Sequence, residues 1–194
     1  MQEKSKTGDS FGAGLVASPP LKEEATVIGV YTAECYDKDG NLKWSETFDN
    51  VVTDVGKASM LDNYFGTSSG GTASGANAMG LKGTGAAAST NTMTSHAAWL
   101  EVGGANAPAY SSGTRPTPTF GAASGVTTVN KVTSAVSFTF TSGGTVAGAF
   151  ICVGTGATTK DATTGTLYSA GDFASSRTVV STDVLNVTYT ATLS

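Results

Sequence analysis

Residues 50–65 read Asn-Val-Val-Thr-Asp-Val-Gly-Lys-Ala-Ser-Met-Leu-Asp-Asn-Tyr-Phe, and the interpretation of the whole chain starts from this stretch. Nowhere else do apolar residues recur at helical spacing over more than two turns. The row that we expect to face a core consists of Val55, Ala58, Leu61 and Phe65, with Met60 and Tyr64 beside it. Thr53 or Asp54 can cap the first turn, and Gly66 follows as a C-cap glycine would. The stretch therefore predicts one helix packed on a core.

The composition predicts that this helix accompanies an all-β domain. The chain has 194 residues, which is enough for one well-buried core. Glycine contributes 25 residues, and charged residues make up only 13%, against roughly a quarter in ordinary domains. Threonine favours strands and glycine favours turns, so a chain rich in both is typical of β-strands joined by loops.

Several stretches have the pattern of strands. Residues 25–36 and 42–48 alternate in polarity around the turn signal Asp39-Gly40, which predicts a hairpin. Residues 145–153 are apolar on both faces, which predicts a central strand covered on both sides, and 185–193 form a closing strand. About eight to ten short strands favour a β-sandwich or jelly-roll-like domain over residues 25–194. Their order cannot be read from the pattern.

The first 24 residues predict an extended N-terminal arm. They mix charges, glycines and prolines with thinly spread apolar residues, and they have too few apolar groups to bury themselves. We expect contacts with neighbouring subunits to order this arm, because ordering entropy must be offset by contacts. The candidate partner-binding residues are its larger apolar side chains, Phe11, Leu15, Val16 and Leu21.

No constellation of residues points to catalysis. His96 is the one histidine, and beside Trp99 it is interpreted as a packed or surface residue. Glu34 and Glu46 lie on adjacent predicted strands, so a glycosidase-like pair is geometrically conceivable, but salt-bridge or solvated roles are favoured. We predict that the protein is not an enzyme and has no catalytic residues.

Cofactors, metals, nucleic acids and membranes are equally unsupported. The Asp-Lys-Asp-Gly-Asn run at 37–41 faintly resembles a calcium loop but lacks the later bidentate glutamate. The glycine-rich stretches lack the Lys-Ser/Thr ending of a phosphate loop. The net charge of −4 with no basic run argues against nucleic acid, and no apolar run approaches the roughly 20 residues of a membrane helix.

Two cysteines, Cys35 and Cys152, sit in separate strand-like runs. A disulfide between them is one interpretation. Two buried free thiols in a chain made in a reducing cytoplasm are favoured, because free cysteine is among the most buried residue types.

Four motifs carry a resemblance to a known group. They are residues 48–57 (Phe-Asp-Asn-Val-Val-Thr-Asp-Val-Gly-Lys), 95–102 (Ser-His-Ala-Ala-Trp-Leu-Glu-Val), 114–116 (Thr-Arg-Pro) and 164–171 (Thr-Gly-Thr-Leu-Tyr-Ser-Ala-Gly). Together they resemble motifs of small virion proteins of tailed bacteriophages, which are encoded among head and tail genes. The similarity covers roughly residues 26–194 and excludes the arm. It implies a structural role and carries over no catalytic residue.

The first functional hypothesis is therefore a capsid decoration or cement protein on the outer capsid surface of the virion. Its expected partners are the major capsid protein and further copies of itself, most plausibly as a trimer. The alternative is a tail, neck or fibre component that acts as an adaptor or binds a receptor. A third hypothesis is an isolated carbohydrate-binding module, in which Tyr110, Tyr168 or Trp99 would stack on sugar.

Overall fold

The computed structural model describes residues 26–65, 76–125 and 128–194. Its elements are β1 (Val27–Tyr36), β2 (Leu42–Val52), α1 (Asp54–Phe65), β3 (Ala76–Lys82), β4 (Glu101–Val102), β5 (Val129–Val132), β6 (Val136–Thr139), β7 (Gly144–Gly154), β8 (Thr166–Val179) and β9 (Val184–Leu193). The prediction of an all-β domain with one short helix is confirmed. The predicted arm, residues 1–24, lies outside the described residues.

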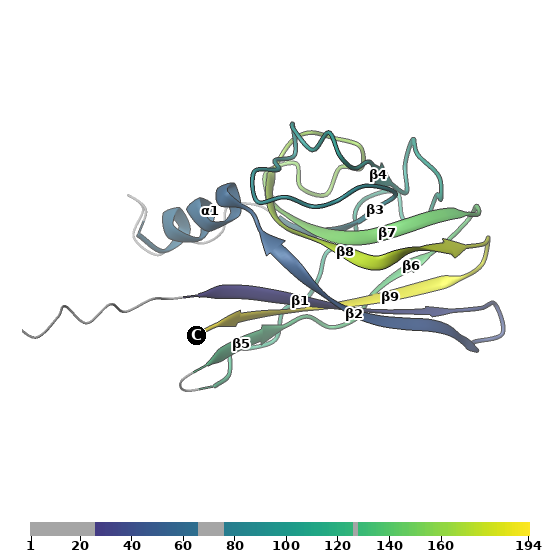
Figure 1. Cartoon of the computed structure of the whole chain (residues 1–194), viewed down its shortest axis with the longest axis horizontal. Coiled ribbons are helices and arrows are strands. Elements are labelled where there is room, and N and C mark those ends of the chain that lie inside the picture. Colours follow the sequence, from purple (N-terminus) through teal and green to yellow (C-terminus); the bar gives the residue numbers. More distant parts are fainter. Residues whose placement is uncertain (1–25, 66–75, 126–127) are drawn as a thin grey trace, which may run out of the picture.

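The strands form two facing layers that share β2 (Figure 1). The order in one layer is β5-β9-β1-β2, and β6 also pairs with β9, nearer the start of that strand than β5. The order in the other layer is β2-β8-β7-β3-β4. All pairings are antiparallel. The chain passes between layers within β2, because Asp49 still pairs with Val30 of β1 whereas Asn50 pairs with Gly171 of β8.

The main core lies between the layers and follows from strand alternation. In β1, Tyr31 and Cys35 are fully buried, and β9 places Leu185 and Tyr189 directly opposite them. Phe48 of β2 stacks on Tyr31 with ring centroids 5.3 Å apart, and it meets Phe173 of β8 edge-on at 4.8 Å. The aromatic contacts across the two layers add to the stabilisation that their buried area provides.

A second apolar cluster covers the outer face of the β3-β7-β8 layer. Its members are Ala78, Met93, Trp99, Phe150, Cys152, Ala157, Leu167 and Ala170. Met93 and Trp99 come from the segment between β3 and β4, and Ala157 comes from the segment between β7 and β8. Residues 146–152 of β7 are therefore buried on both faces, which confirms the predicted central strand.

Buried ion pairs hold these covering segments. Arg115 is fully buried and donates two hydrogen bonds of 2.7 Å to the carboxylate of Glu101, and it also donates to the carbonyls of Ala157 and Ala162. Lys82 is buried beside Asp172, with which it forms an ion pair. Burial lowers the pKa of Lys82, while Asp172 opposes that shift.

Both cysteines are buried free thiols, as the favoured interpretation predicted. Cys35 lies in the main core and Cys152 in the outer cluster. Burial raises the pKa of each thiol to about 11.

Helix α1 has the predicted bounds, but the first two members of its predicted apolar row do not face the core. Thr53 caps it by accepting a hydrogen bond from the backbone N–H of Gly56 at 3.0 Å. Val55 is 36% exposed and Ala58 is exposed as well. The helix contacts β8 through buried Gly56, where the missing side chain lets the helix approach the backbone of Tyr168. The side chains of residues 61–65 and the predicted cap Gly66 lie outside the described residues.

Candidate functional site

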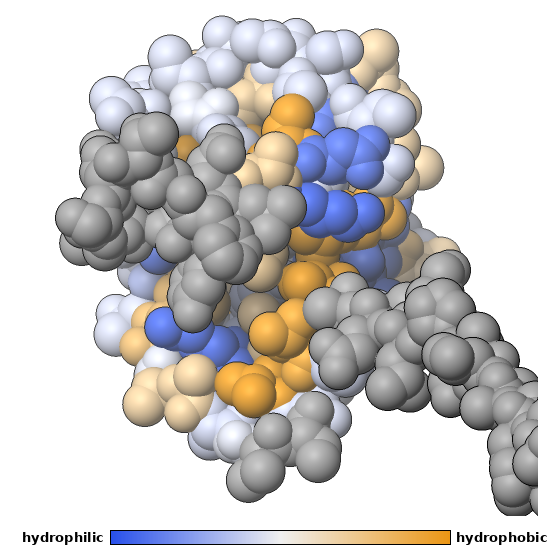
Figure 2. All heavy atoms as spheres, turned by 90° about the vertical axis from the view of Figure 1, so that its left-hand side faces the viewer, coloured by the Kyte–Doolittle hydropathy of each residue, from blue (hydrophilic) through white to orange (hydrophobic). Residues whose placement is uncertain are grey.

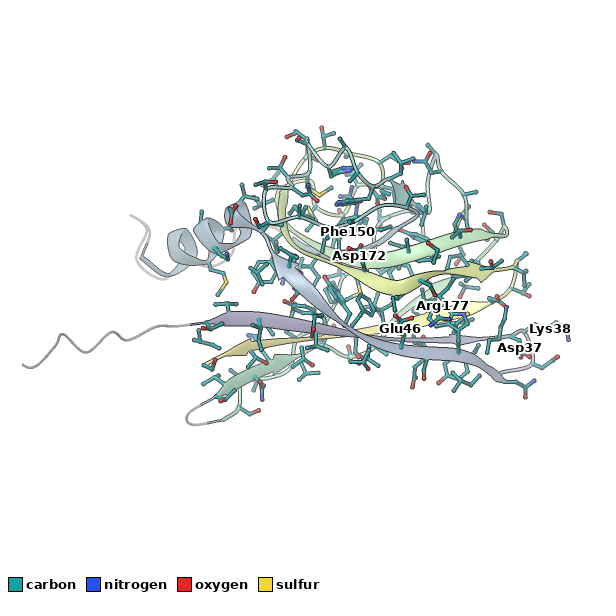
Figure 3. All side chains as sticks on the ribbon, viewed as in Figure 1. Asp37, Lys38, Glu46, Phe150, Asp172 and Arg177 are labelled. Atoms are coloured by element: carbon teal, nitrogen blue, oxygen red, sulfur yellow. The ribbon has the colours of Figure 1, made fainter. Side chains whose placement is uncertain are left out.

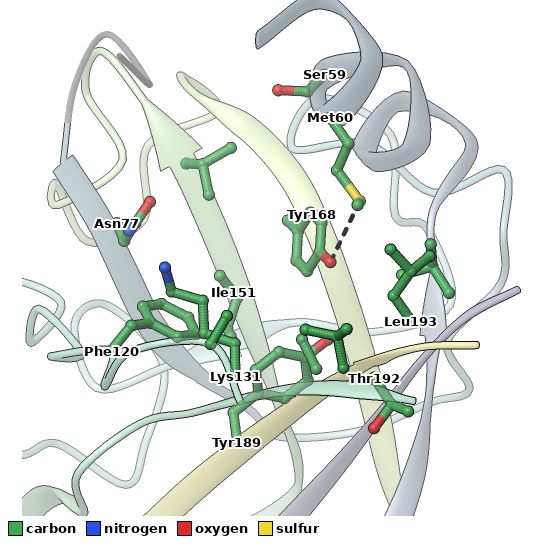
Figure 4. Close-up of a pocket in the computed structure, with 15 residues that line it drawn as sticks. Ser59, Met60, Asn77, Phe120, Lys131, Ile151, Tyr168, Tyr189, Thr192 and Leu193 are labelled. Atoms are coloured by element: carbon green, nitrogen blue, oxygen red, sulfur yellow. Dashed lines mark hydrogen bonds between the residues drawn. The ribbon is translucent and has the colours of Figure 1, made fainter. Parts of the chain in front are cut away.

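An apolar pocket opens at the end of the sandwich where α1 lies (Figure 4). Its volume is about 360 Å³. Its lining is Val27, Ser59, Met60, Asn77, Phe120, Ala123, Val129, Lys131, Ile151, Val153, Tyr168, Tyr189, Ala191, Thr192 and Leu193. A volume in the range of about 300–1,000 Å³ is typical of sites that bind small molecules or anchoring side chains.

The pocket exists because β2 changes layers. The pairing of β1 with β2 extends only to Val30, and from Asn50 onward β2 belongs to the other layer. Beyond that point β1, β9 and β5 supply one wall, and β7 and β8 supply the other. Helix α1 adds Ser59 and Met60 at the side, so strands of both layers and the helix meet around one apolar space.

Two tyrosines, together with Asn77, supply polar atoms to the interior wall. Tyr168 donates a hydrogen bond to the sulfur of Met60 at 3.4 Å, and the Tyr189 hydroxyl accepts one from Asn50 at 3.2 Å. Their rings meet edge-on with centroids 6.4 Å apart. Burial raises the pKa of both hydroxyls above the ordinary value, so both stay neutral at physiological pH. The interior therefore suits an uncharged, apolar group.

Glycines place these two tyrosines. A Cβ atom at Gly29 of β1 would overlap the hydroxyl of Tyr189, and one at Gly56 of α1 would overlap the carbonyl oxygen of Tyr168. Neither glycine stands out in the sequence as part of a site. Sequence reasoning missed the pocket because its residues come from seven elements and connecting segments that only the fold brings together.

The rim of the pocket combines exposed apolar groups with one positive charge. Leu193 is 44% exposed at the rim. Lys131 is exposed and forms no ion pair with any described residue. Figure 2 shows apolar side chains gathered in a band on this end of the molecule.

Glu34 and Glu46, the conceivable glycosidase-like pair, do not face each other. Ala33 pairs with Glu46 and Glu34 pairs with Ser45, so Glu34 and Glu46 point to opposite faces of the same layer. Figure 3 shows Glu46 and Arg177 facing each other between the layers, and their ion pair measures 2.7 Å. The favoured salt-bridge role of Glu46 is confirmed.

His96 and the 37–41 run have structural contacts. The His96 ring stacks on Trp99 at 4.0 Å and its Nδ1 lies 2.8 Å from the Trp99 carbonyl oxygen. Asp37 accepts backbone hydrogen bonds from Asp39 and Asn41, which stabilises the turn between β1 and β2. Across the described ranges, no group of three or more potential ligands could hold a metal ion.

The four candidate partner-binding residues, Phe11, Leu15, Val16 and Leu21, lie outside the described residues. The structure therefore does not bring them together with any other group. Among residues 26–65, 76–125 and 128–194, no helix has the length and apolar content needed to cross a membrane.

Comparison of the chain with models of protein families, with curated proteins and with solved structures found no match.

Proposed function

We propose that this protein is a non-enzymatic structural protein of a tailed bacteriophage, and that it decorates the outer capsid surface. In this role it binds the lattice of the major capsid protein and stabilises the shell. The proposal rests on the resemblance of four motifs to small phage virion proteins, together with the positions of those motifs in the fold.

The positions of the motifs are the observation that carries the proposal. Arg115, in motif 114–116, forms its buried ion pair with Glu101, in motif 95–102. Thr53, in motif 48–57, donates its backbone N–H to Tyr168, in motif 164–171, at 3.0 Å. The residues that carry the resemblance therefore join one another inside the framework of the domain. The resemblance therefore rests on residues that specify the fold.

The apolar end of the sandwich supports attachment to a larger assembly. Exposed Leu193 lies at this end beside the pocket, while charged residues make up only 13% of the chain. Contacts of this kind depend little on long-range charge, so binding should survive moderate salt. Several weak contacts made at once by an oligomer, such as a trimer at local three-fold positions, would raise the total affinity.

The test uses particles that lack this protein, to which the purified protein is added back. Occupancy and the temperature of DNA release are measured over a series of salt concentrations. We expect high occupancy at each salt concentration and a higher release temperature, because a protein that binds only the assembled shell favours that shell. Full occupancy with unchanged heat resistance would contradict a cement role.

The alternative is a component of the tail, neck or fibre, and the copy number separates the two. Decoration requires occupancy over the whole capsid surface. Occupancy confined to one vertex would overturn the decoration proposal in favour of the alternative.

A further inference from the structure

The pocket at the α1 end is apolar inside and, among the described residues, open at its rim. Its interior presents Ile151, Val153 and Met60 around two neutral tyrosines. Burial of apolar surface stabilises a contact in proportion to the area removed from water. An apolar segment inserted here would therefore gain stability from burial alone.

The chain itself contains a segment with matching chemistry. Residues 11–21 read Phe-Gly-Ala-Gly-Leu-Val-Ala-Ser-Pro-Pro-Leu and contain no charged residue. Phe11, Leu15 and Val16 offer apolar side chains, and the small residues between them allow close approach to a wall. The described structure starts at Thr26, immediately before Val27, which lines the pocket. The segment is thus tethered at the rim of the pocket.

The residues between this segment and Thr26 have a composition that favours extended backbone. Thr26 pairs with Ser194 through hydrogen bonds of 2.8 and 3.1 Å, so the pairing of the two chain segments extends to the first described residue. Residues 22–25 read Lys-Glu-Glu-Ala and lack the residues that form tight turns. Pro19 and Pro20 have fixed φ angles and favour extended backbone. This combination favours insertion into a neighbouring copy.

The charges at the rim of the pocket and next to the segment are consistent with insertion into a neighbouring copy. Lys131 at the rim has no ionic partner among the described residues, and Asp9 stands two residues before Phe11. A segment whose apolar residues enter the pocket can therefore bring a carboxylate close to the Lys131 ammonium group at its edge. The pair would be exposed and would contribute to register more than to affinity.

We infer that the pocket accepts residues 11–21 of a second copy of this chain, with Phe11, Leu15 and Val16 as the side chains that enter it. Each copy then donates one segment and accepts one. The inference stands independently of the capsid proposal, because it concerns the purified protein alone.

The test is disulfide capture between two full-length variants that are purified separately and differ in mass through a tag. One carries Val16→Cys in the segment, and the other carries Ala123→Cys at the pocket. The matched control replaces the second variant with Lys38→Cys, on the exposed hairpin at the opposite end of the sandwich (Figure 3). The unmodified protein is the blank, since buried Cys35 and Cys152 have pKa values of about 11 and react little.

We expect the Val16→Cys and Ala123→Cys mixture to yield at least about tenfold more mixed dimer than the control mixture, because docking raises the effective concentration of the thiols. Adding Phe11→Ser to the Val16→Cys chain should reduce this yield severalfold. Equal yields from both mixtures would overturn the inference. A chain with both Val16→Cys and Ala123→Cys that closes only on itself would also overturn it and indicate docking within one chain.

Discussion

The outer face of the β3-β7-β8 layer and the α1 end of the sandwich are both apolar, but they differ in what covers them. On the outer face, Trp99 and Phe150 are buried under segments of the same chain, and the fully buried Arg115 has its charge paired with Glu101. At the α1 end, Leu193 is 44% exposed and a pocket of about 360 Å³ opens between the layers.

The difference separates stability from interaction. Apolar surface that the chain covers with its own segments contributes to folding, and the polar groups of those segments are paired because an unpaired buried charge is costly. Apolar surface left open contributes nothing to folding of the monomer and is available to a partner. Substitutions in the two regions should therefore affect different measurements.

The largest loss of stability is expected from removing the Arg115–Glu101 ion pair of the covered face. Arg115→Met leaves the Glu101 carboxylate buried without its partner and removes the donors to two carbonyl groups. The free energy of unfolding, measured in urea, should fall by about 3–5 kcal/mol. Lys57→Met, which removes the exposed Lys57–Asp54 pair, is the control and should change little. A loss under about 1 kcal/mol for Arg115→Met would contradict the role given to the pair.

A smaller loss of stability is expected at high pH from the two buried thiols, one in the covered face and one in the main core. It measures how well each region excludes water. The pKa of each thiol is about 11 in the folded protein, above its ordinary value of 9.0, so the stability that each provides is fully present below pH 9. It is lost as the pH rises through about 11, by no more than about 3 kcal/mol for each thiol. Urea unfolding at pH 8 and pH 11 measures this loss.

The single variants Cys35→Ala and Cys152→Ala separate the two regions. Each should show a smaller difference between pH 8 and pH 11 than the unmodified protein. A Cys152→Ala variant with an unchanged difference would indicate that water reaches the covered face and would break the comparison on that side.

At the open end, Gly56→Ala should destabilise the protein even though alanine is the better helix former. In an ordinary helix the substitution would gain up to about 1 kcal/mol. Here the added Cβ would overlap the Tyr168 carbonyl oxygen, so we expect a loss of about 1–3 kcal/mol in thermal or urea unfolding. The matched control is Lys57→Ala, at the next residue of the helix, whose side chain is exposed. A stabilised Gly56→Ala variant would show that α1 does not need its close contact with β8.

The smallest effect on stability is expected from deleting residues 1–24. In dilute solution the melting temperature should stay nearly unchanged, because the sequence of residues 1–24 has too few apolar residues to form part of a core. Self-association, measured by sedimentation over a range of concentrations, should weaken markedly. A drop of several degrees in dilute solution would place the arm within the fold of the monomer.

Much of the fold could be predicted from local pattern. Polar and apolar alternation identified β1 and β9, the Asp39-Gly40 signal identified the hairpin, and apolar residues on both faces identified β7 as central. Capping chemistry placed the start of α1 correctly at Thr53 and Asp54. These predictions succeeded because each depends on residues close together in the chain.

Other features depended on contacts between distant residues and were missed or wrong. Residues 107–118 contain three prolines, a composition typical of a surface segment, yet Arg115 within them is fully buried, because Glu101 and two carbonyl groups satisfy its guanidinium. Val55 was expected to face the core, but the helix packs through Gly56. A glycine has no side chain to mark a contact face, so helical periodicity of apolar residues cannot reveal such a contact.

The sequence by itself determined the all-β class, the single short helix and the doubly buried strand. The period of polar and apolar residues sets which face of a strand can be buried, whatever the strand later pairs with. Only the tertiary structure decided the strand order, the passage of β2 between layers and the pocket that this passage opens. Those features arise from pairing between residues far apart in the chain, such as Asn50 with Gly171, and no local pattern specifies that choice.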